Sequence, residues 1–77
     1  MKNQKQILEN RKALLERQKE EIKRELRHLN LIKLDARELG SADDFYRGLC
    51  KETFELNCQI LALTKQIRSI DAELAVA

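Results

Sequence analysis

The sequence has no proline and no tryptophan, and glycine occurs only at Gly40 and Gly48. Proline and glycine are the residues that most often interrupt helices, so nothing in residues 2–39 is expected to break a helix. Apolar runs are also short. None approaches the ~20 residues of a membrane span, and the first ten residues, MKNQKQILEN, lack the apolar core of a secretory signal. We therefore expect a soluble cytoplasmic protein that does not contact a membrane.

What is present is charge and helix-forming apolar residues. Charged residues make up 36% of the 77 residues and apolar ones 43%, a composition typical of long helices and coiled coils. The charge is uneven. Residues 1–39 contain 11 Lys/Arg and 7 Asp/Glu, whereas residues 40–77 contain 4 and 6. A chain of this length forms one domain with a small core.

The spacing predicts two helices, at about residues 3–39 and 42–75, joined by a turn at 40–41. Gly40 suits a helix end in the left-handed conformation, which costs glycine little. Ser41 followed by Asp44 resembles a capping box that starts the second helix. A turn this short makes the helices antiparallel, so the predicted fold is an all-α, coiled-coil-like two-helix hairpin, residues 1–77 forming one unit.

Heptad repeats in both halves support the hairpin. When the chain is folded at Gly40, five layers form in one register, because each residue of the first set faces one of the second. The first set is Leu8, Leu15, Ile22, Leu29 and Ala36, and the second is Leu74, Ile67, Ile60, Thr53 and Tyr46.

A second heptad row in the second helix lacks apolar partners. Leu56, Leu63 and Ile70 face Glu25, Gln18 and Arg11 in the same register. A helix that is apolar over so wide an arc is usually buried among several helices. We therefore predict a homodimer forming a four-helix bundle. Its predicted interface consists of Leu49, Phe54, Leu56, Ile60, Leu61, Leu63, Ile67 and Ile70.

No group of residues suggests catalysis. His28 is the single histidine, and Cys50 and Cys58 are eight residues apart, about 12 Å along a helix. That distance is too long for a disulfide within the chain, and the spacing is not that of a zinc or redox site. We expect reduced thiols buried as small apolar groups, no metal, no cofactor and no enzymatic activity.

Three kinds of binding remain as interpretations. The leading one is a small interaction protein that binds another macromolecule, as an adaptor, chaperone or inhibitor would; Leu31 and Leu34 are a candidate contact patch. The alternative is a regulator that binds nucleic acid, RNA above all, through a basic face of the first helix. The candidate residues of that face are Lys5, Lys12, Lys19, Lys23 and Arg27. The third is an oligomer that binds a small anion such as a nucleotide through Arg37, Arg47 and Lys51.

Overall fold

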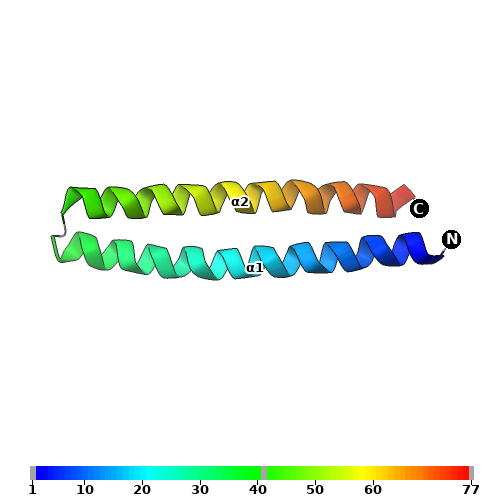
Figure 1. The fold of residues 1–77 in the computed structure, drawn as a ribbon, viewed down its shortest axis with the longest axis horizontal. Coiled ribbons are helices and arrows are strands. Elements are labelled where there is room, and N and C mark those ends of the chain that lie inside the picture. The colour runs from blue at the N-terminus through cyan, green and yellow to red at the C-terminus, as the bar shows by residue number, and fades with distance from the viewer. Residues whose placement is uncertain (1, 41, 77) are drawn as a thin grey trace.

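The computed structural model describes residues 2–40 and 42–76, which form two helices packed side by side. Helix α1 spans Lys2–Glu38 and helix α2 spans Asp43–Val76. The helices are antiparallel, so the first residues of α1 and the last residues of α2 lie at the same end of the molecule (Figure 1). The predicted all-helical hairpin is confirmed.

The turn between the helices depends on Gly40. Its φ is +69°, in the left-handed region that side-chain-bearing residues rarely adopt. The helical hydrogen bonding continues as far as Leu39, whose amide donates to the carbonyl of Asp35 at 2.9 Å. Helix α2 then begins with Asp43 and Asp44 in its first turn, where negative charge is favourable. The predicted capping role of Ser41 lies outside the described residues.

The core is a single seam between the helices. Among the described residues, four apolar ones are buried: Leu15, Ala36, Leu49 and Ile70. Leu8, Ile22 and Leu29 in α1, and Leu56, Ile60, Leu63 and Ile67 in α2, are half-buried. Thr53 and Thr64, also half-buried, donate their hydroxyl protons to the carbonyls of Leu49 and Ile60 at 2.8 Å.

Beside its apolar row, α1 has a second heptad row that faces α2, and this row consists mostly of lysines. Lys12, Lys19, Leu26 and Lys33 are half-buried, whereas Arg11, Gln18 and Glu25 are exposed. Lysine can cover apolar surface with its methylene groups while its ammonium stays in water. The seam of α1 therefore combines apolar residues and lysines.

The hairpin is far from spherical. It measures 59 × 14 × 13 Å and has a radius of gyration of 17.4 Å, compared with about 11.5 Å for a compact domain of this length. Its accessible surface is 6289 Å², compared with about 4,900 Å² for a compact monomer of its mass. The chain thus exposes about 1,400 Å² more than a compact fold would.

Candidate interaction surfaces

Six of the eight residues predicted for an oligomer interface belong to the seam within the chain. Leu49 and Ile70 are buried there, and Leu56, Ile60, Leu63 and Ile67 are half-buried. Phe54 and Leu61 lie outside the seam, with 68% and 64% of their surface exposed. Because the four half-buried residues still have accessible surface, a further layer of side chains could pack onto them.

One side of the hairpin is hollowed along the groove between the helices and is rich in carboxylates. We call it the acidic side. Among the described residues, three hollows open there, and the largest of these three, about 410 Å³, lies between Glu25, His28, Glu52 and Glu55. The polar and small residues that line the three hollows are Arg11, Gln18, Glu21, Glu25 and His28 from α1, and Glu52, Glu55, Gln59, Ala62, Gln66, Ser69 and Glu73 from α2.

The floor of the acidic side is apolar. Seven seam residues also line the hollows: Leu8, Leu15, Ile22, Leu29, Leu56, Leu63 and Ile70. Arg11 and Ile70 share one hollow, Gln18 and Leu63 another, and Glu25 and Leu56 the third. These are the mismatched pairs that the sequence register sets opposite each other. The acidic side is therefore a groove with an apolar floor and polar walls.

The opposite side of the seam, which we call the basic side, carries the row of lysines. Lys12 Nζ lies 2.6 Å from Asp71 Oδ1 of α2 and 3.9 Å from Glu16 Oε1. The hydrogen bond and the charge of Asp71 raise the pKa of Lys12 above its usual 10.5. Lys33 Nζ lies 6.0 Å from the centre of the Tyr46 ring, within the range of a cation–π contact.

The five residues predicted as a nucleic-acid face are thus distributed over different surroundings. Lys12 and Lys19 border the seam, and Lys5, in the same heptad row, is exposed. Lys23 Nζ lies 3.6 Å from Glu20 Oε1 within α1, and the Arg27 side chain is exposed. Lys33 belongs to the same row as Lys5 but is not among the five predicted residues; its position fourteen residues after Lys19 was the available signal.

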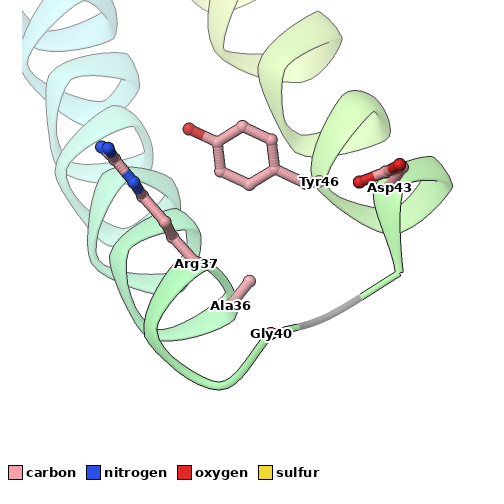
Figure 2. Close-up of a pocket in the computed structure, with 5 residues that line it drawn as sticks. All are labelled: Ala36, Arg37, Gly40, Asp43 and Tyr46. Carbon is pink, nitrogen blue, oxygen red and sulfur yellow. The ribbon is translucent and has the colours of Figure 1, made fainter.

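The structure does not gather the predicted anion-binding residues into one hollow. A hollow of about 560 Å³ at the turn is lined by Ala36, Arg37, Gly40, Asp43 and Tyr46. Figure 2 shows the Tyr46 ring extending from α2 into the space between the helices, with Arg37 on the facing helix. Arg47 and Lys51 are exposed and do not line this hollow, and the Asp43 carboxylate there opposes an anion.

Groups that could perform chemistry are dispersed. Within residues 2–40 and 42–76, no cluster of three or more His, Cys, Asp or Glu side chains could hold a metal ion. Both cysteines are free thiols. Cys50 is half-buried but Cys58 is exposed, so the expectation that both are buried was wrong for Cys58. It lies on α2 away from the seam, because it falls outside both heptad rows that face α1.

Comparisons with known proteins add no assignment. The chain matches no protein-family model, no curated protein and no solved structure at a significant level. In the described part of the chain, neither helix has a stretch long and apolar enough to cross a bilayer.

Proposed function

We propose that this chain is a small, non-enzymatic cytoplasmic interaction protein that associates with itself, as a homodimeric four-helix bundle, and binds another macromolecule on its outer surfaces. The thinness of the core supports self-association best. Four described residues are buried, and each chain exposes about 1,400 Å² beyond a compact fold of its mass. A standard protein interface buries about 800 Å² per partner, so this excess is large enough to form one.

Sedimentation equilibrium over a range of concentrations tests self-association. We expect a mass of twice 9.0 kDa at micromolar concentration and a melting temperature that rises with concentration, since association stabilises the folded state by mass action. A chain that stays monomeric and folded at micromolar concentration would refute this proposal.

Exposed apolar side chains away from the acidic groove are the candidate contacts for another macromolecule. They are Leu31 and Leu34 on α1, with 63% and 52% of their surface exposed, and Phe54 and Leu61 on α2. Phe54 and Leu61 are seven residues apart and share one face of their helix. Exposed apolar side chains grouped in this way mark sites of contact with other proteins. Phe54 and Leu61 were predicted for the oligomer interface, but because both lie outside the seam and away from the acidic groove, we propose them instead as contacts for another macromolecule. Phe54→Ser should then weaken capture of a protein partner from the source cell without changing the mass of the assembly.

Nucleic-acid binding through α1 is a second candidate, favoured by the alignment of Lys5, Lys12, Lys19 and Lys33 on one heptad row. The row extends about 42 Å, so it could follow several phosphates. The pairing of Lys12 with Asp71 acts against such binding, because the ammonium would have to leave one carboxylate to reach a phosphate. No comparable observation favours the small-anion alternative, since Arg37, Arg47 and Lys51 do not share a hollow.

A pair of matched variants tests the nucleic-acid proposal. Lys5 and Lys19 lie fourteen residues apart on α1, as do the exposed Lys51 and Lys65 on α2. Replacing the first two by Gln should weaken RNA binding and reduce its salt dependence by roughly two counterions, whereas replacing the second two should do neither. Equal losses in both variants, or no RNA retardation at low salt, would exclude a site on α1.

A further inference from the structure

The acidic side extends to both ends of the hairpin and becomes apolar there. In a heptad coiled coil, residues seven apart share a face, so Ile7 and Leu14 lie in one row with Glu21 and His28, and Leu39 lies in one row with Gln18 and Glu25. By the same rule, Phe45 lies in the row of Gln59, and Val76 in the row of Ala62 and Ser69.

Among the described residues, these end residues include most of the large apolar side chains that are strongly exposed. Ile7, Leu14, Leu39, Phe45 and Val76 have exposed fractions of 62%, 53%, 83%, 54% and 87%. The acidic side thus has apolar ends, an apolar floor and polar walls in its middle. Exposed apolar surface of this extent marks a contact surface.

We propose that a second copy of this chain covers the acidic side, packed so that the two turns lie at opposite ends of a four-helix bundle, with α1 on α1 and α2 on α2. This inference rests on the proposed self-association and specifies its surface and orientation. The twofold axis then crosses the middle of the hairpin, and each contact between the copies occurs twice.

The rows of α1 match in this arrangement. Antiparallel packing sets Ile7 against Leu39 of the second copy, and Leu14 against Ile32. The same register sets Arg11 against Asp35, and Gln18 against His28. Exposed apolar residues meet apolar residues. Arg11, which among the described residues is the one arginine or lysine lining the three hollows, meets a carboxylate. Apolar contact and charge therefore favour one register.

The rows of α2 give nearly the same twofold position. Phe45 meets Val76 of the second copy, Gln59 meets Ala62, and Glu73 meets Gly48. Small residues let helix backbones approach closely, and a side chain added at Gly48 would meet nothing within 4 Å in its own chain. The α1 pairs place the twofold axis at residue 23, and the α2 pairs place it between residues 60 and 61. These two positions differ by about 2 Å along the bundle, so one twofold axis allows both the α1 pairs and the α2 pairs to form.

The arrangement with both turns at the same end is less well matched. It would place α1 on α2 of the second copy and would pair Ile7 with Val76, but in the same register it would set Leu14 against Ser69. Apolar side chains facing polar ones gain little from burial. The opposite-end arrangement has one unfavourable contact, Glu21 facing Glu25 near the axis, and that contact provides a sharp test.

Charge substitutions measure the contacts in solution. In the proposed dimer, Glu25→Lys replaces a repulsion by an attraction, so the dissociation constant from sedimentation equilibrium should fall about tenfold, and Arg11→Glu should raise it by about the same factor. Combining Arg11→Glu with Asp35→Arg should restore wild-type affinity. Lys51→Glu, a charge reversal on an exposed residue of α2, is the control and should change little.

Cross-linking measures the orientation independently of affinity. With Cys50→Ser and Cys58→Ser as background, a chain carrying Ile7→Cys should form a disulfide with a chain carrying Leu39→Cys, and neither should cross-link to its own kind. Cross-linking of Ile7→Cys to Val76→Cys instead would overturn the orientation. If the wild type dimerises but neither pair of cysteine variants cross-links and the charge substitutions leave the dissociation constant unchanged, this surface is refuted and self-association stands. A monomeric wild type would refute both.

Discussion

Removing the Leu63 side chain distinguishes a free hairpin from a bundle through stability alone. Leu63 is half-buried in the single chain and lines a hollow of the acidic side. Full burial of a leucine side chain stabilises a fold by about 1.5–3 kcal/mol, so in a free hairpin Leu63→Ala should cost about 1 kcal/mol. Ile70 is only 6% exposed, and Ile70→Ala should cost about 2–5 kcal/mol in either state.

In the bundle, Leu63→Ala and Ile70→Ala should lower the free energy of unfolding by similar amounts. The second copy covers the rest of Leu63, so the cost of Leu63→Ala rises to about 2–5 kcal/mol. Urea unfolding followed by circular dichroism at a low and a high protein concentration provides the measurement. A Leu63→Ala cost that remains near 1 kcal/mol at high concentration, with a midpoint independent of concentration, would show that Leu63 stays half-exposed and that the dimer reasoning is wrong.

Two further predictions concern the turn and the ion pair. Gly40→Ala should destabilise the hairpin by about 1–2 kcal/mol, because φ is +69°. In the free hairpin, Gly48→Ala should instead be stabilising by about 0.5–1 kcal/mol of helix propensity, because a Cβ there meets nothing within 4 Å in its own chain. Thermal melts of both variants at a protein concentration low enough to keep the chain monomeric check the contrast, and equal effects would contradict it. Asp71→Asn should bring the pKa of Lys12 back toward 10.5, as an NMR titration of the Lys12 side chain would show. Because that pKa is raised in the folded state, the stabilisation from the pair is complete below pH 10.5 and is lost as the pH rises through the raised value. Wild type and Asp71→Asn should therefore differ less in stability well above pH 10.5 than at neutral pH.

Much of the architecture was accessible from sequence because it depends on local chemistry. The absence of proline, the single turn glycine and two heptad rows of α2 predict an all-helical hairpin, and the positive φ of Gly40 agrees with its expected role. Leu56, Leu63 and Ile70 also lie opposite Glu25, Gln18 and Arg11, as their spacing indicates.

The surfaces were less accessible, because a lysine spacing does not say what the lysines face. Lys5, Lys12 and Lys19 share a face on any helix, but only the packed structure shows that this row borders α2 and that Lys12 reaches Asp71. The exposure of Cys58 was missed for a related reason. A wide apolar arc suggests burial, and a single hairpin is too thin to bury all of it.

The sequence by itself determined the two helices and the position of the turn, because these follow from residue spacing and backbone preference. The tertiary structure decided how far α1 is rotated about its own axis. The rows Arg11–Gln18–Glu25 and Lys12–Lys19–Leu26 flank the Leu8–Leu15–Ile22 row on either side, so periodicity allows either one to face α2. Packing placed the second row in the seam, where long lysine stems cover apolar surface and Asp71 receives an ammonium. The same rotation left the first row on the acidic side, opposite the half-covered leucines of α2.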